Sequence, residues 1–303
     1  MAQLNHPALL FLLQVALPLY LAATAASAAP IMQLVEITGG HPIVGKGGNT
    51  IDLVLDQSSA SGFQSKQQFL FARLDMKIKL PANDSAGTVT TFYMSSQGAA
   101  HDEIDLEFLG NVSGQPIVLH TNIYAQGKGD KEMQFYLWFD PRAQYHTYSI
   151  LWNPQFIIIY VDGKPIRAFP NLSGMGIPFP TSQNMRMYAS IWNADDWATQ
   201  GGRVKTNWSH APFLASYTSF QATSCPATSK NSRCMISRSR SGKVPQLDNA
   251  TRSTIQSLQK KYMIYNYCAD KARFPQGLPP ECSVQLREGV RGRVCVRVSQ
   301  GTE

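Results

Sequence analysis

The sequence is poor in charged residues and rich in residues that interrupt helices. Of its 303 residues only 16% are Asp, Glu, Lys or Arg, while 22 are Gly and 18 are Pro. This composition suits a loop-rich β protein better than a helical bundle. Hydrophobic residues make up 44% of the chain, which is ordinary for a globular protein and argues against disorder.

Long apolar runs are absent except at the beginning of the chain, so no later segment is expected to span a bilayer. The run ALLFLLQVALPLYLAA lacks a preceding Lys or Arg and leads into small residues with an A-x-A-like site at 26–28. A membrane anchor is the alternative, but Pro18 and the small residues favour cleavage. We therefore expect residues 1–28 to be a secretory signal peptide.

Cysteine is absent before residue 225, and none of the five cysteines lies in a C-x-x-C pattern that would favour a zinc site. In an oxidising compartment, closeness in sequence suggests the pairs Cys225–Cys234 and Cys268–Cys282, each contributing about 3 kcal/mol. Cys295 is then odd: it is either free or displaces one of these partners.

Positive charge exceeds negative charge, with a net charge of +7, and much of the excess lies in RSRSGK and REGVRGRV. A basic secreted protein can bind acidic polysaccharide, although solubility alone also explains the charge. Nucleic acid binding is not favoured because no recognised module accompanies the charge. Glycosylation sequons, which fit secretion, occur at Asn83, Asn111, Asn171, Asn207 and Asn249.

Short β-rich runs separated by turn residues recur from about residue 50 to 215, among them IDLVLD, GTVTTFYMSS, IVLHTNIYA and HTYSILWN. Asp-Gly within YVDGKPI predicts a hairpin. The pattern predicts a jelly-roll sandwich of two antiparallel sheets. Beyond Ser216 the chain becomes polar, and a helix is then expected in LDNATRSTIQSLQKKYMIY, capped by Asp248 or Asn249, with Ile255, Leu258 and Tyr262 on its packed face.

The stretch HDEIDLEFLGNVS, residues 101–113, has a pattern that calls for an explanation. Strand alternation sends its apolar and acidic side chains to opposite faces. The apolar residues are Ile104, Leu106 and Phe108, and the acids are Glu103, Asp105 and Glu107. A solvated face is one interpretation, but adjacent like charges repel and raise at least one pKa, which favours a functional role.

Two carboxyl groups with separated pKa values are the equipment of glycoside hydrolysis. Four residues of strand span about 13 Å, whereas retaining enzymes place the two groups about 5–5.5 Å apart and inverting ones about 6.5–9.5 Å apart. The strand is therefore expected to be bent or strongly twisted, so that Glu103 and Glu107 lean together.

The motif HDEIDLEFLGN resembles the active-site strand of plant xyloglucan endotransglucosylase/hydrolases, members of glycoside hydrolase family sixteen. SAGTVTTFYMSSQG, WNADDWATQGG and YMIYNYCADKARFPQGLPPEC resemble that family too, in its order, so the resemblance covers about residues 62–282. It implies an all-β, concanavalin-like jelly roll over residues 29–215 as the catalytic domain, and a disulfide-containing extension with a helix over residues 216–303.

The resemblance also implies residue roles. Glu103 would be the nucleophile, Glu107 the general acid and then base, and Asp105 the residue that orients Glu103, while Asn111 matches the usual glycan site. No metal and no organic cofactor are implied. The positions matching sugar contacts are Tyr93, His120, Asn122, Asp130, Lys131, Glu132, Trp192, Asp196, Trp197, Gly201, Tyr265 and Arg273.

The implied protein is a monomer, secreted to the cell wall and apoplast, that cuts xyloglucan and transfers it to a second xyloglucan chain, without nucleic acid or membrane partners. Water as acceptor would make it a hydrolase. A non-catalytic lectin is disfavoured by the intact Glu103 and Glu107, and a bacterial-type β-glucanase by the C-terminal extension. The chain departs from the family at Gly39, where Trp is usual, at Leu106, where Phe is usual, and at Lys131, where Arg is frequent.

Overall fold

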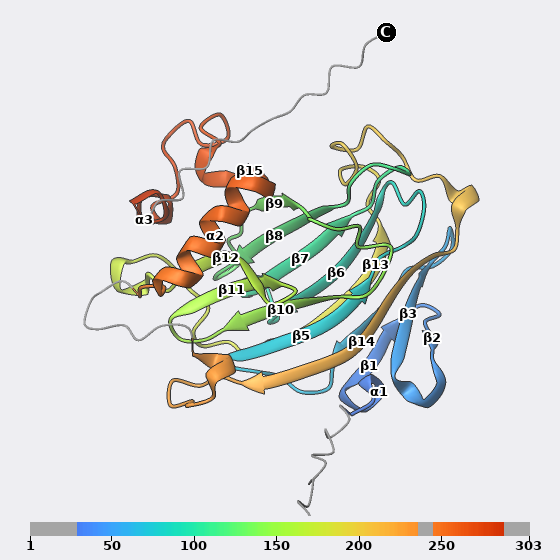
Figure 1. Ribbon diagram of the computed structural model, residues 1–303, viewed down its shortest axis with the longest axis horizontal. Helices are drawn as coiled ribbons and strands as arrows, with labels where there is room; N and C mark the ends of the chain where they lie inside the picture. The colour runs from blue at the N-terminus through green and yellow to red at the C-terminus, as the bar shows by residue number, and fades with distance from the viewer. Residues whose placement is uncertain (1–28, 236–244, 288–303) are drawn as a thin grey trace, which may run out of the picture.

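Two antiparallel sheets pack face to face in the computed structural model, which describes residues 29–235 and 245–287 (Figure 1). The expected two-sheet sandwich is therefore confirmed. In spatial order the 8-stranded sheet consists of β1 (Val35–Gly39), β4 (Ser61–Ser65), β13 (Arg186–Asn193), β6 (Thr88–Ser95), β7 (Glu103–Leu109), β8 (Val118–Tyr124), β9 (Met133–Tyr136) and β15 (Met263–Asn266).

The 7-stranded sheet covers the inner face of the 8-stranded sheet, and both curve in the same sense (Figure 1). Its strands in spatial order are β12 (Lys164–Pro170), β11 (Phe156–Val161), β10 (His146–Trp152), β5 (Ala72–Lys79), β14 (Phe213–Ser224), β3 (Thr50–Leu55) and β2 (Ile43–Val44). β14 runs across the expected division between residues 215 and 216, so the sheet itself continues to Ser224.

Helices are few and short in the part of the chain that the structure describes. They are α1 (Ile31–Leu34), α2 (Asn249–Tyr262) and α3 (Glu281–Arg287), with 3-10 turns η1 (Lys46–Gly48), η2 (Ser173–Met175), η3 (Trp208–His210), η4 (Ser232–Cys234) and η5 (Tyr267–Ala269). Within the described ranges, no helix is both long and apolar enough to cross a membrane.

Alternation along β7 builds the core between the sheets. Ile104, Leu106 and Phe108 are buried, and the Phe108 ring meets Tyr148 of β10 edge to face with 4.7 Å between centroids. The apolar face of the acidic strand therefore points inward, as predicted, and leaves the three acids on the outer face of the 8-stranded sheet.

Two local predictions are confirmed. Asp162 and Gly163 join β11 to β12 with φ values of 47° and 72°, the left-handed conformation that a two-residue hairpin turn requires. Asp248 caps α2 by accepting a hydrogen bond from the Thr251 backbone N–H at 2.8 Å. Ile255 on the inner side of α2 is buried, and the helix lies against β12 (Figure 1).

Both expected disulfides are formed: Cys225–Cys234 and Cys268–Cys282, with Cα–Cα distances of 5.2 and 5.3 Å. The signal peptide, Cys295, the segment RSRSGK and all of REGVRGRV after Arg287 lie outside the described residues. The basic-charge and free-thiol predictions therefore stay predictions.

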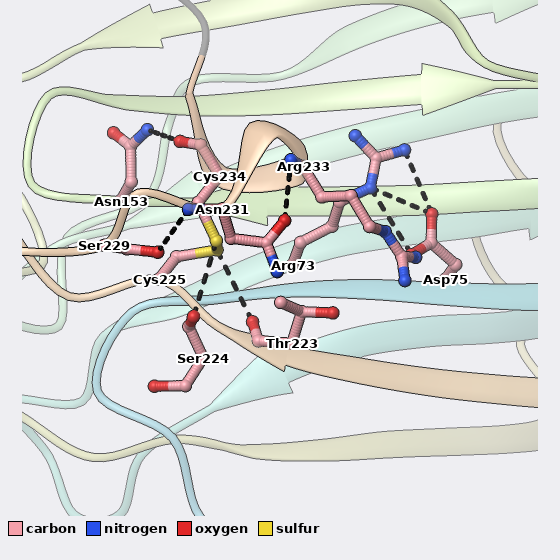
Figure 2. The surroundings of a disulfide bond; sticks show 10 residues. All are labelled: Arg73, Asp75, Asn153, Thr223, Ser224, Cys225, Ser229, Asn231, Arg233 and Cys234. Carbon is pink, nitrogen blue, oxygen red and sulfur yellow. Dashed lines mark hydrogen bonds and ion pairs between the residues drawn. A yellow bond between two sulfur atoms is a disulfide. The ribbon is translucent and has the colours of Figure 1, made fainter.

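Asp75 anchors the Cys225–Cys234 loop to the outer face of the 7-stranded sheet (Figure 2). Its carboxylate accepts hydrogen bonds from Ser149 Oγ at 2.6 Å and Arg73 Nε at 3.1 Å, and it pairs with Arg233, the neighbour of Cys234. A largely buried carboxylate is stabilised here only because every partner is present.

We predict that Asp75→Asn lowers the free energy of unfolding by about 2–3 kcal/mol, because two arginines lose their counter-charge. Urea unfolding with intact disulfides measures this. The matched control is Asp140→Asn, which breaks the pair with Arg142 at a half-exposed carboxylate and should cost less than about 1 kcal/mol. Equal losses for the two variants would contradict the anchoring role of Asp75.

Candidate active site

An open groove of about 1120 Å³ crosses the outer face of the 8-stranded sheet. Side chains from four adjacent strands, β13, β6, β7 and β8, line it together with two residues from neighbouring loops. The lining residues are Thr91, Tyr93, Glu103, Asp105, Glu107, His120, Asn122, Tyr124, Glu132, Ser190, Trp192 and Trp197.

β7 places all three acids in this groove because it lies in the middle of the sheet. Asp105 is paired across the strands with Tyr93 on β6 and Asn122 on β8, and Glu107 with His120. Flanking strands on both sides limit the access of water, so that Asp105 is only 7% exposed and both glutamates are half-buried. The three carboxyl groups therefore share one partly desolvated site.

Burial and mutual repulsion raise the pKa of two of these acids. Burial, followed by the charges of Glu103 and Glu107, raises the pKa of Asp105 well above its usual range, and its protonated carboxyl donates a hydrogen bond to Glu103. Burial, followed by the charges of Glu103 and Glu132, raises the pKa of Glu107 to about 7. The groove thus places the Asp105 carboxyl as a hydrogen-bond donor beside Glu103 and a proton donor at Glu107.

His120 stands opposite Glu107 as a neutral imidazole. Burial is the main reason that its pKa falls to about 4, and the charges of Arg167 and Arg273 lower it further, against the attraction of Glu132. Gln134 Nε2 lies 3.0 Å from Nδ1 and donates to it, which leaves the proton on Nε2, 3.8 Å from Glu107 Oε2. The imidazole is therefore oriented toward the acid without adding a charge.

Aromatic rings flank the acids. Trp197 lies 6.2 Å from both the His120 and Trp192 rings, measured between centroids, beside the Glu107 end of β7. Tyr93 stacks on Tyr188 of β13 at 5.1 Å. Such rings present flat apolar faces of the kind that stack on sugar rings in concave sites.

The C-terminal extension adds a cluster of polar groups beside the groove. Arg273 donates hydrogen bonds to Glu132 at 2.6 and 3.0 Å, to Asp130 at 2.6 Å and to the Tyr265 hydroxyl at 3.3 Å. Tyr265 belongs to β15, which pairs with β9 and so forms the edge of the sheet. Burial opposes ionisation of Glu132, but the bonds and charge of Arg273 prevail and lower its pKa.

Six residues matched to sugar contacts do not line the groove: Asp130, Tyr265 and Arg273 belong to the cluster beside it, and Lys131, Asp196 and Gly201 lie elsewhere. Lys131 Nζ donates to the carbonyls of Lys128 and Gly129 in its own loop, at 3.2 and 2.8 Å. Asp196 and Gly201 are exposed in the segment after β13. Asn111, the expected glycan site, lies after β7, where its side-chain amide donates to the Pro116 carbonyl at 2.9 Å.

Sequence reasoning missed several residues of the site. Tyr124 follows His120 and Asn122 at two-residue spacing on β8, and Ser190 precedes Trp192 in the same way, so alternation would have revealed both. Tyr188 precedes Ser190 at the same spacing, so alternation would have revealed it as well, whereas Gln134 contacts His120 from the neighbouring strand β9. Within the described residues, no cluster of three or more His, Cys, Asp or Glu is arranged to hold a metal ion.

Comparison with known proteins agrees with this geometry. The family model described as "Glycosyl hydrolases family 16" matches residues 33–210, and "Xyloglucan endo-transglycosylase (XET) C-terminus" matches residues 231–282. "Xyloglucan endotransglucosylase/hydrolase protein 15" of Arabidopsis thaliana is 58% identical over 78% of this chain and 83% of its own. "Xyloglucan endotransglucosylase protein 7" of Diospyros kaki is 55% identical over 82% and 95%.

Solved structures share the fold. A prokaryotic beta-1,3-1,4-glucanase (lichenase) from a mouse hindgut metagenome has a TM-score of 0.50 and 21% identity, covering 63% of this chain and 93% of its own. The apo Crh5 transglycosylase has a TM-score of 0.51 and 23% identity, covering 61% and 78%. With the family model spanning residues 33–210 and relatives above 50% identity, the chain belongs to glycosyl hydrolases family 16, among the xyloglucan endotransglucosylase/hydrolases.

Proposed function

We propose that the protein is a secreted xyloglucan endotransglucosylase. It cleaves the β-1,4-glucan backbone of xyloglucan through a covalent glycosyl-enzyme and rejoins the fragment to another xyloglucan chain. The observation that carries this is the placement of Glu103, Asp105 and Glu107 in one open groove, with protons held on the latter two. The names of the relatives supply the substrate.

In the first step, a carboxylate oxygen of Glu103 attacks the anomeric carbon. Glu107 gives its proton to the glycosidic oxygen, so the bond to the departing chain breaks as the ester bond to Glu103 forms. The hydrogen bond from Asp105 keeps Glu103 oriented in the groove. A pKa of Glu107 near 7 means that the proton is present at mildly acidic pH.

In the second step, the ionised Glu107 takes the proton from a hydroxyl of the acceptor chain. The acceptor oxygen bonds to the anomeric carbon and releases Glu103, which restores the starting protonation of both acids. The same carbon is substituted twice, so its configuration is retained. Water in place of the acceptor would give hydrolysis, which is the alternative function of this site.

Transfer is ranked above hydrolysis because the groove offers binding groups beyond the acids. Trp192 and Trp197 flank Glu107, while Tyr265 and Arg273 continue the polar surface past Glu132. An acceptor held by such groups is pre-oriented for attack, whereas water is not. A non-catalytic lectin would not need a protonated acid opposite a carboxylate.

The proposal includes secretion to the cell wall and apoplast as a monomeric glycoprotein with a glycan at Asn111. The two disulfides support an oxidising compartment. No metal or organic cofactor takes part in the steps above.

We predict that the purified protein incorporates labelled xyloglucan oligosaccharide into long xyloglucan chains, and that Glu103→Ala loses this by several orders of magnitude with unchanged thermal unfolding, because the nucleophile is removed. Size-exclusion chromatography of the labelled polymer measures transfer. Asp56→Asn, on an exposed turn after β3, is the control and should keep full activity. Shortening of the chains without uptake of the label would indicate hydrolysis. If the chains neither shorten nor take up label, the protein is a non-catalytic lectin.

We predict that the activity falls as pH rises through about 7, because Glu107 then loses the proton it must donate. Glu132→Gln should move this alkaline limb to lower pH, since the Glu132 charge raises the pKa of Glu107. Asp130→Asn is the matched control: it removes another partner of Arg273 and should leave the limb in place. Profiles of kcat/KM against pH decide, and an identical shift in both variants would contradict the assignment.

A further inference from the structure

Arg167 is a buried cation without a role in the steps above. It belongs to β12 of the 7-stranded sheet, is 1% exposed, and extends through the core to the 8-stranded sheet. One guanidinium nitrogen donates to the Thr121 carbonyl at 2.9 Å and to Thr121 Oγ1 at 2.7 Å, and the other donates to the Lys131 carbonyl. Burying a guanidinium costs free energy, so a functional role would explain why Arg167 is kept between the two sheets.

The contacts of Arg167 lie directly beneath the groove. Thr121 stands between His120 and Asn122 on β8 and is paired across the sheet with Leu106 of the acidic strand. Lys131 donates its backbone N–H to Asn122 Oδ1 at 3.1 Å and precedes Glu132. One side chain therefore holds, from the inner side, both segments whose outer sides carry groove residues.

The groups that favour the charge of Arg167 come from both the groove and the C-terminal extension: they are Tyr267, Glu132, Asp105 and Glu281, in decreasing order of effect. Tyr267 and Glu281 belong to the extension and are buried, and the Tyr267 hydroxyl donates to Glu281 Oε1 at 3.4 Å. Each directly precedes one half of the Cys268–Cys282 disulfide. The disulfide thus fixes two of the groups that stabilise the buried guanidinium.

We propose that Arg167 is a positioning residue of the groove, which fixes β8 and the segment before β9 from within the core and depends on Tyr267 and Glu281 for its burial. The inference rests on the proposed function, because activity reports on the position of His120 and Glu132. It also has an electrostatic side, since the charge of Arg167 disfavours a protonated His120.

The activity of the folded protein separates this role from plain stability. His120 is faced by Glu107 on β7, Glu132 before β9 and Arg273 from the extension, with Arg167 beneath. Burial is the main reason that the pKa of His120 is low, and burial remains when the Arg167 charge is lost, so the imidazole stays neutral near the pH at which Glu107 titrates. The alkaline limb of activity should therefore stay in place while kcat/KM falls.

The experiment compares Arg167→Lys, Arg167→Met and Arg167→Met/Glu281→Gln with the wild type, all as full-length protein. Arg167→Lys keeps the charge but cannot make the planar fork contacts, so kcat/KM for transfer should fall about tenfold or more with the alkaline limb unmoved. Arg167→Met should lose at least as much kcat/KM, also with the alkaline limb unmoved. The double variant removes the Glu281 carboxylate that Arg167→Met leaves without this counter-charge, so it tests the same loss of kcat/KM if Arg167→Met does not fold.

Arg73→Met is the matched control, an arginine of the same sheet that binds Asp75 and not β8. It should lower stability with an unchanged pH profile and kcat/KM at temperatures where it is folded. Arg167 variants that behave like Arg73→Met would overturn the positioning role while leaving the enzyme intact. Wild-type protein with neither transfer nor hydrolysis would overturn the proposed function, and this inference with it.

Discussion

Repulsion among three carboxyl groups on one face of β7 is the constraint around which the groove is organised. Glu103, Asp105 and Glu107 share a site with little water, and there the ionisation of all three would be costly. Protons on Asp105 and Glu107 relieve the repulsion, and the same protons serve the acid catalysis and the orientation of Glu103 that we propose. Protonation of two acids therefore both lowers the repulsion along β7 and provides the groups that the proposed reaction needs.

The rest of the sheet maintains this arrangement. His120 faces Glu107 as a neutral group because burial and two arginines disfavour its protonation, so no cation competes for the carboxylate. Glu132 has the opposite effect, since its negative charge helps to keep the proton on Glu107, and Arg273 holds it in place. Elements from both the jelly roll and the extension therefore set the protonation of one acid.

Local physics made much of the fold predictable. Three features were predicted correctly because each depends on neighbours in sequence. Alternation predicted the two faces of β7, Asp-Gly predicted the β11–β12 turn, and the Asp248 cap predicted the start of α2. Short spacing also gave both disulfides.

The remaining features depend on pairing between distant segments. Tyr188 reaches Tyr93 only because β13 lies beside β6, a strand far from it in the sequence. An arginine within "PIRAF" gives no sign in sequence that it will cross the core to Thr121. The resemblance to a family located the groove residues that spacing alone left open, although Lys131 directs its amine back to its own loop.

Because the groove runs across the strands, the spacing between strands sets a regular interval along it. Neighbouring strands lie about 4.8 Å apart, close to the length of one sugar unit in an extended glucan. A chain lying across β13, β6, β7 and β8 would meet a new strand with each successive sugar. The extension adds β15 as one more strand at the edge of this sheet, so the surface available to a polymer lying across the strands can lengthen by a single strand without any change at the acids.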